Sequence, residues 1–216
     1  MSESSQKSSP PPVARREPRR QRGQLRVEAL LAAAAQVFAD KGYDAATTAE
    51  IAQAAQSSIG SLYQFFPTKE ALARAVIAGQ AADLRGRLEG MAAASPAWSR
   101  TELAAQMLGA LVAFRGSHPS FARLLDSPGA PEALILEVRR EVRERVAAVL
   151  APHLPGLDAA RLTAVATVVQ QLMKSAVAIH DDAAAGSPAS VRAALDELRR
   201  ALEAYLDGLP GAGPVR

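Results

Sequence analysis

Three helix-start signals follow one another closely along residues 47–68. Thr47 and Glu50 have the spacing of a capping box, in which two residues satisfy each other's free backbone N–H groups. Ser58 can cap a second short helix, and Thr68 can cap the longer helix that follows it, the fourth of the chain. Segments this short leave room only for two small helices around a tight turn. The pattern therefore predicts a helix-turn-helix module with a supporting helix on each side.

The rest of the chain predicts an all-α fold of about nine helices, because Ala, Leu, Arg and Glu dominate and long β-branched alternation is lacking. The first helix is expected to begin at Leu25 and to end at Gly42, a C-cap glycine. A long fourth helix then leads into a second helical domain. Its further helices are expected at 99–116, 119–126, 131–151, 158–182 and 188–207. We expect a disordered arm over 1–24, a helix-turn-helix domain over 25–72, a C-terminal domain over 73–208 and a flexible tail over 209–216.

The positive charge of the chain is concentrated at its N-terminus. The whole chain has a formal net charge of +3, whereas residues 1–26 hold seven basic residues against Glu3 and Glu17. A local excess of this kind indicates a polyanionic partner or a solubilising tail. Arginine-rich arms reach into narrow minor grooves in other helix-turn-helix proteins. The candidate residues of the arm are Arg15, Arg16, Arg19, Arg20 and Arg22.

The second short helix carries groups suited to reading a DNA duplex. Gln64 can pair with an adenine edge, and Ile59 can contact a thymine methyl group. Gly60 lowers the stability of this helix, and close approach of a ligand to the backbone would explain why glycine stands there. Lys69 opposes the dipole of the fourth helix, which is explained if a phosphate binds there. Ser58 and Ser61 supply further hydrogen-bonding groups, and Tyr63 is either core or a phosphate contact.

The segment GYDAATTAEIAQAAQSSIGSLYQFFPTKEAL, residues 42–72, resembles the DNA-binding signature of the TetR family of one-component bacterial repressors. Nearly all fixed positions agree in order and spacing, and the match extends over about 50 residues. The resemblance implies phosphate contacts from Thr47, Thr48, Tyr63 and Lys69. It also implies groove-facing positions at Ile59, Gly60, Ser61 and Gln64.

Three departures from the family pattern bear on affinity. Gln56 and Ser57 replace the usual Gly-Val of the turn, which specifies the turn less tightly. Phe65 replaces a frequent Tyr or His, so it loses a polar phosphate contact and can pack on a sugar or methyl group instead. Ala49 offers no hydrogen bond where some members carry a base-reading side chain. Affinity is therefore expected to depend more on the arginine arm.

The resemblance further implies a homodimer on a palindromic operator, formed by the last two long helices. Two reading helices about 34–36 Å apart match successive major-groove turns. Apolar stripes on both helices favour this over a purely intramolecular core, because a monomer would leave them poorly covered. The candidate interface residues are Leu162, Val165, Val169, Leu172, Ala176, Leu195, Leu198, Leu202, Tyr205 and Leu206.

Family members commonly bind an inducer inside the C-terminal domain, and the resemblance implies such a site here. A mostly apolar set of candidate residues favours an apolar or aromatic effector, although the same residues can be plain core. The candidates are Trp98, Met107, Leu111, Phe114, Phe121, Leu125, Val142, Gln171, Met173 and His180. The alternative is a regulator of the same fold without ligand response, constitutive or controlled by a partner protein.

Other classes of function are disfavoured by the sequence. The chain has no cysteine and only three histidines, so neither a metal site nor another cofactor is expected. The sequence also lacks a recognisable set of catalytic residues. Asp181 and Asp182 beside His180 are interpreted as the solvated end of a helix, so an enzyme is not expected. The N-terminus lacks the apolar core of a signal peptide, and uncharged apolar runs are too short for a membrane span. We expect a cytoplasmic protein.

Overall fold

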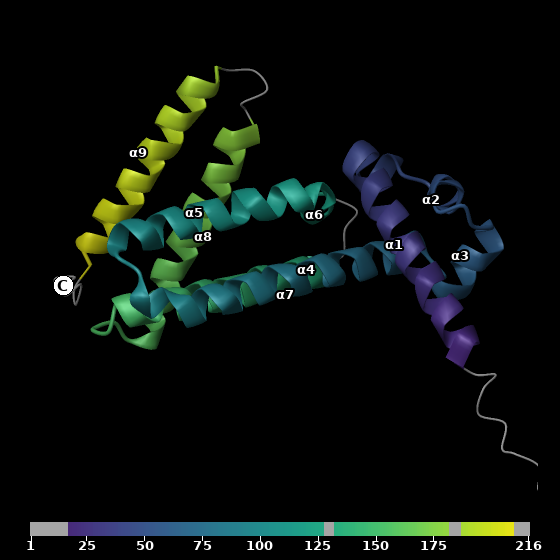
Figure 1. Cartoon of the computed structure of the whole chain (residues 1–216), viewed down its shortest axis with the longest axis horizontal. Helices are drawn as coiled ribbons and strands as arrows, with labels where there is room; N and C mark the ends of the chain where they lie inside the picture. Colours follow the sequence, from purple (N-terminus) through teal and green to yellow (C-terminus); the bar gives the residue numbers. More distant parts are fainter. Residues whose placement is uncertain (1–16, 128–131, 182–186, 210–216) are drawn as a thin grey trace, which may run out of the picture.

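The computed structural model describes residues 17–127, 132–181 and 187–209, which form nine α-helices and two short 3₁₀ turns without strands (Figure 1). The first four helices are α1 (Glu17–Ala45), α2 (Thr48–Ala54), α3 (Ile59–Phe65) and α4 (Lys69–Ala94). The C-terminal part adds α5 (Arg100–Ser117), α6 (Pro119–Leu125), α7 (Glu132–Leu150), α8 (Ala159–Asp181) and α9 (Pro188–Asp207). The predicted all-α class is confirmed, and the predicted helices of the C-terminal part agree with these bounds within two residues.

Helices α1 to α3 form a small module at one end of the molecule (Figure 1). Leu30, Phe38, Ile51 and Leu62 are fully buried and hold the three helices together. The predicted caps are present: Thr47 and Glu50 form a capping box at α2. The Ser58 and Thr68 side chains accept hydrogen bonds from the backbone N–H groups of Ser61 and Ala71 at the starts of α3 and α4.

Helix α1 departs from the prediction at its start. It begins at Glu17 rather than at Leu25, so residues 17–24 of the expected disordered arm are helical. Pro18 is compatible with this because proline fits the first turn of a helix, and the Arg and Gln residues that follow are good helix formers. Residues 1–16, with Arg15 and Arg16, lie outside the described residues. At the other end, Gly42 breaks the helix with a φ of 77°, a left-handed conformation that glycine adopts without strain.

Helix α4 connects the module to the C-terminal domain. It runs beside α7, α6 contacts both α4 and α5, and α8 packs against α5 and α7 (Figure 1). Helix α9 closes the domain by packing on α8 and α5. One continuous core extends from α1 to α9, and α6 also packs against α1. The two parts of the chain are therefore connected twice, through α4 and through the contact between α6 and α1.

Candidate nucleic-acid interface and internal cavity

Helix α3 presents an exposed outward face. Its exposed residues, with the N-cap, are Ser58, Ile59, Gly60, Tyr63, Gln64 and Phe65. Large apolar groups remain in solvent here, since Ile59, Tyr63 and Phe65 are 42%, 47% and 38% exposed. A Cβ built on Gly60 would meet no atom within 4 Å, so packing within the chain does not require glycine at this position. These residues are free to meet an outside partner.

Thr48 and Tyr63 form a polar pair between α2 and α3. Their hydroxyl oxygens lie 3.0 Å apart, and either can be the donor. Because one hydrogen bond uses one hydroxyl hydrogen, the second hydrogen stays available for an acceptor outside the chain. The pair thus offers one donor directed by two helices, in keeping with the expected phosphate contacts at both residues.

Thr47 and Ser61 are placed differently from the expectation. The Thr47 hydroxyl donates to Glu50 Oε2 at 3.0 Å and accepts from the Glu50 N–H at 3.2 Å. Its hydroxyl hydrogen is therefore already used within the capping box. Ser61 is only 8% exposed and lies on the inner side of α3, where its hydroxyl accepts from Arg26 Nη1 at 3.3 Å. Ser61 therefore points inward in this structure, unlike the exposed residues of α3 that the same prediction named.

Lys69 also has a different environment from the predicted phosphate clamp. Its ammonium donates to the carbonyl oxygens of Tyr43, Asp44 and Ala46 at 2.8, 3.2 and 3.1 Å. It also lies 4.5 Å from the centre of the Tyr43 ring. All three ammonium hydrogens are used, and the free carbonyls at the end of α1 are satisfied by a cation. The unfavourable position at the start of α4 is offset by this contact with the end of α1.

The turn between α2 and α3, where Gln56 and Ser57 depart from the family pattern, has two unfavourable features. Gln56 has a φ of 50°, the one positive φ among the described non-glycine residues. The buried Ser57 hydroxyl lacks a hydrogen-bond partner in the described structure. The turn that sequence comparison marked as loosely specified thus holds a strained backbone and an unsatisfied polar atom.

A cavity of about 290 Å³ lies in the C-terminal domain between α4, α5, α6, α7 and α8. Six predicted residues line it: Leu111, Phe114, Phe121, Leu125, Val142 and Met173. Four others do not, namely Trp98, Met107, Gln171 and His180. Trp98 and Met107 pack in the core away from it, and Gln171 and His180 are exposed on α8. Gln170, next in sequence to the predicted Gln171, is buried and lines the cavity instead.

Charged side chains at the cavity were missed by the sequence reading. Arg115 pairs with Asp181 at 3.1 Å, and Arg139 pairs with Asp126 at 3.7 Å. Lys174 also lines the cavity, and burial lowers its pKa, with a further lowering by Arg139 that Asp126 opposes. Each of these residues looks like an ordinary solvated charge in the sequence. Only the packing of α5, α7 and α8 brings them to one opening.

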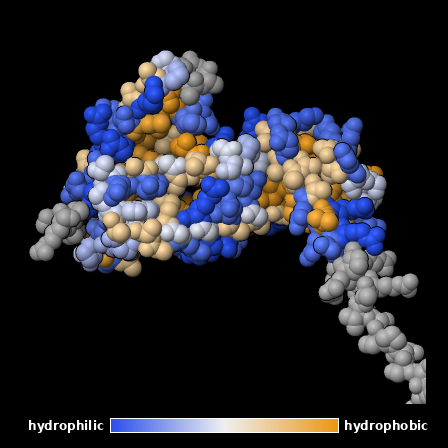
Figure 2. All heavy atoms as spheres, viewed as in Figure 1, coloured by the Kyte–Doolittle hydropathy of each residue, from blue (hydrophilic) through white to orange (hydrophobic). Residues whose placement is uncertain are grey.

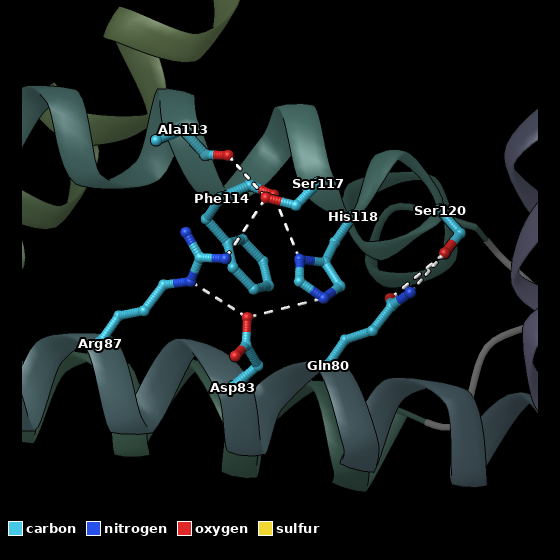
Figure 3. A network of polar contacts seen from close by, with 8 residues as sticks. All are labelled: Gln80, Asp83, Arg87, Ala113, Phe114, Ser117, His118 and Ser120. Atoms are coloured by element: carbon cyan, nitrogen blue, oxygen red, sulfur yellow. Dashed lines mark hydrogen bonds and ion pairs between the residues drawn. The ribbon is translucent and has the colours of Figure 1, made fainter. Parts of the chain in front are cut away.

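One wall of the cavity connects to α4 through a polar network (Figure 3). The His118 ring stacks on Phe114 with centroids 4.4 Å apart, and its Nε2 lies 3.6 Å from Asp83 Oδ2. Asp83 also accepts from Arg87 Nε at 3.0 Å. The His118 backbone N–H also bonds to the carbonyl oxygens of Phe114 and Arg115 at the end of α5.

Helix α6 connects the same cavity to the DNA-binding module. Phe121 and Leu125 face the cavity, while Arg123 Nη1 donates to the carbonyl oxygen of Asp40 in α1 at 3.0 Å. Just after α6, the Ser127 hydroxyl donates to Asp44 Oδ2 at 3.4 Å. On the α4 side, Gln80 Nε2 donates to the Ser120 hydroxyl at 2.8 Å. A change in cavity shape therefore has a short physical route to α1 and α4.

The apolar stripes of α8 and α9 are partly internal. Five predicted interface residues are buried within one chain: Val165, Val169, Ala176, Leu202 and Leu206. These belong to the core of the C-terminal domain, because they face α5, α7 and the other helix of the pair. The other five are only partly buried: Leu162, Leu172, Leu195, Leu198 and Tyr205.

Helix α8 nevertheless exposes much apolar surface. In the described part of the chain it is the one helix long and apolar enough to cross a membrane by length and composition, and a third of its most apolar window is buried. Val168 is 41% exposed on its outer face. Figure 2 shows hydrophobic residues gathered on the arm that α8 and α9 form beside α5. This surface is the strongest candidate for contact with another chain.

Two family models match the chain. The model for bacterial regulatory proteins of the tetR family matches residues 30–76, and the model for the tetracyclin repressor-like C-terminal domain matches residues 101–206. No curated protein sequence gives a significant match.

Solved structures of the same fold cover nearly the whole chain. FadR from Bacillus subtilis in complex with stearoyl-CoA is 15% identical, with a TM-score of 0.65 over 88% of this chain and 99% of that one. A TetR-like transcriptional regulator from Rhodococcus sp. RHA1 is 25% identical, with a TM-score of 0.61 over 85% and 97%. FadR from Bacillus halodurans is 17% identical, with a TM-score of 0.65 over 86% and 97%. The chain belongs to the TetR family of DNA-binding transcriptional regulators.

Proposed function

We propose that the protein is a cytoplasmic homodimeric repressor that binds a palindromic operator and is released by a small effector in its C-terminal cavity. The observation that carries the DNA-binding part is the outward face of α3. Ile59, Tyr63 and Phe65 keep 42%, 47% and 38% of their surface exposed there, while Leu62 on the opposite face is fully buried. A helix that keeps apolar and amide groups in solvent on one side is suited to a major groove.

Within that face, the proposed division of labour is between base edges and phosphates. Gln64 pairs with an adenine edge, and Ile59 contacts a thymine methyl group. Gly60 lets the helix approach the groove wall closely. Thr48 and Tyr63 share one outward hydroxyl hydrogen for a phosphate oxygen.

The basic N-terminal part of α1 supplies general attraction to the duplex. Positions 19, 22 and 26 follow helical spacing and so share one face of α1. Arg26 reaches Ser61 of α3, which directs that face toward the reading helix. Arg19 and Arg22, with Arg20 beside them, are thus expected to contact phosphates next to the groove that α3 reads, and to raise the salt dependence of binding.

The dimer is proposed to form through the outer faces of α8 and α9. The partly buried residues Leu172, Leu198 and Tyr205, with the exposed Val168, give each chain an apolar surface that a second copy can cover. A symmetric pair also matches the two half-sites of a palindrome.

The effector is proposed to act through the two contacts that join the cavity to the reading module. A ligand against Phe114 and Phe121 presses on the His118 network toward α4 and on α6 toward α1. Release then requires the ligand to prefer the arrangement of the two modules that does not fit the operator. FadR from Bacillus subtilis, a protein of the same fold, is known in complex with stearoyl-CoA.

The test is a selection of bound duplexes from random DNA with the full chain, followed by affinity measurements on the enriched site. We expect a palindromic site, and a loss of roughly tenfold in affinity for Gln64→Ala, with relaxed preference at one base pair of each half-site. Gln106→Ala, an exposed glutamine on α5, serves as the matched control and should bind as the unaltered chain does. Failure to enrich any site would contradict the proposal.

A further inference from the structure

The charges around the cavity leave one cation without a hydrogen bond or an ion pair among the residues that the structure describes. Arg115 and Arg139 have carboxylate partners in Asp181 and Asp126. Lys174 makes neither a hydrogen bond nor an ion pair with any residue that the structure describes. Three cations thus face two carboxylates, and the cavity opening has one positive charge in excess.

Lys174 lies at the exposed opening of the cavity, where its surroundings disfavour its charge. Burial lowers the pKa of the ammonium, Arg139 lowers it further, and Asp126 acts in the opposite direction. An anion bound between Lys174 and Arg139 would reverse this balance, because it would pair with the free cation and screen the two cations from each other. The arrangement is therefore complementary to a negative group on a ligand.

The remainder of the cavity is complementary to an apolar body. Phe114, Phe121, Val138, Val142 and Met173 line it, and all are buried or packed against the core. Gln170 is 6% exposed, and its amide N–H donates to the carbonyl oxygen of Arg139 at 3.3 Å, which holds the backbone behind the charged rim. A cavity of about 150 Å³ holds benzene, so about 290 Å³ has room for roughly twelve non-hydrogen atoms.

We infer that the effector is an amphipathic anion, with an apolar body of about this size in the cavity and a carboxylate or phosphate group between Lys174 and Arg139. This inference rests on the proposed function, and it sharpens the expectation of a mainly apolar ligand by adding one negative charge. The anion competes with Asp126 for Arg139. Asp126 directly follows α6 and precedes Ser127, which bonds to Asp44 of the DNA-binding module. The charged group therefore binds beside the contact that joins the cavity to α1.

The experiment is calorimetric titration of the full chain, without DNA, with four probes that share one alkyl body. Decanoate is about the size that the cavity admits, decan-1-ol lacks its charge, decylamine reverses the charge, and decyl phosphate tests the other anion. We expect both anions to bind at least about tenfold more tightly than the alcohol and the amine. The tighter of the two anions identifies the headgroup class.

Two substitutions separate a charge effect from a general loss of structure. Lys174→Met keeps the side-chain length and should remove the preference for decanoate over decan-1-ol. Asp126→Asn removes the competing carboxylate and should tighten decanoate binding several-fold. Arg192→Met removes an exposed cation of α9 away from the cavity and should change neither value.

Equal binding of decanoate and decan-1-ol, or an unchanged preference in Lys174→Met, would overturn the inference. DNA release is measured separately, so the two ideas can fail independently. If decanoate binds through Lys174 without releasing DNA, the ligand class stands and release by effector is wrong. If a neutral compound releases DNA and decanoate does not bind, the ligand class is wrong and the proposed function stands.

Discussion

The two parts of this molecule carry their functional groups in opposite ways. In the DNA-binding module the reading residues stand on the outside of α3, and the residues that hold the module together lie on its inside. In the C-terminal domain the cavity is lined by core residues such as Phe114 and Met173, which are 1% exposed. On the proposed function, the residues for binding and those for stability are therefore separate in the first region and the same in the second. Substitutions on the exposed face of α3 should therefore leave the fold intact, whereas substitutions of the cavity-lining residues should destabilise it.

The largest expected effect comes from Phe114→Ala. The Phe114 ring stacks on His118 and meets Phe121 edge-on at 5.1 Å, so its loss opens the cavity wall and the core together. We expect the free energy of unfolding to fall by about 3–5 kcal/mol in a urea titration. Phe65→Ala, on the exposed face of α3, should change it by less than about 0.5 kcal/mol while weakening DNA binding. Similar losses in the two variants would refute the contrast between the regions.

Lys69 tests whether a cation at the start of α4 binds DNA or stabilises the fold. Lys69→Met removes three charge-assisted hydrogen bonds to the end of α1, and we expect a loss of about 2 kcal/mol in the free energy of unfolding. Arg74→Met, which removes an exposed cation paired with Glu70, should cost less than about 0.5 kcal/mol. If stability is kept and the salt dependence of DNA affinity falls by about one ion instead, Lys69 binds a phosphate.

Local signals explain why most of the fold was predictable from sequence. The side chains of Thr47, Ser58 and Thr68 each accept a hydrogen bond from the backbone N–H three residues later. Helix starts can therefore be predicted from the adjacent sequence. The start of α1 was missed because proline and arginine composition suggested disorder, although proline fits the first turn of a helix and arginine is a good helix former. The family signature supplied the prediction that α3 carries the reading face.

Long-range partners explain what sequence could not provide. Lys69 was recognised as unusual, but its carbonyl partners are 23 to 26 residues away, at the end of another helix. The apolar walls of the cavity followed from helical spacing, whereas its charged rim did not. Arg115, Arg139 and Lys174 come from three different helices, and a charge on a helix surface gives no sign of which charges face it.

In the DNA-binding module, substitutions in the turn between α2 and α3 should increase stability. Gln56→Gly relieves a left-handed backbone conformation, and Ser57→Val removes a buried hydroxyl without a partner. Each should raise the free energy of unfolding by about 0.5–1 kcal/mol, since the strain and the unsatisfied group disappear. DNA affinity should change little, because neither residue belongs to the reading face. A loss of stability in both variants would mean that the turn is shaped by contacts with these side chains.

The smallest effect concerns two capping boxes, one in each region. In the module, Glu50 accepts from the Thr47 N–H and hydroxyl, and Lys41 Nζ donates to its other oxygen at 2.6 Å. In the C-terminal domain, Glu102 accepts the same two bonds from Ser99 without a lysine. The Lys41 hydrogen bond, followed by those from Thr47, lowers the pKa of Glu50 from 4.5 to about 2. The Ser99 bonds also lower the pKa of Glu102.

Because the folded-state pKa of Glu50 lies below its unfolded value, the cap is fully formed above about pH 4.5 and is lost as the pH falls toward 2. Lys41→Met should raise the pKa of Glu50 and leave it below 4.5, since the two bonds from Thr47 remain. Glu50 would then resemble Glu102, whose pKa should not change and serves as the internal control. Carboxyl-detected NMR titration measures both groups in one sample. An unmoved Glu50 would show that the cap, rather than the ion pair, sets its pKa.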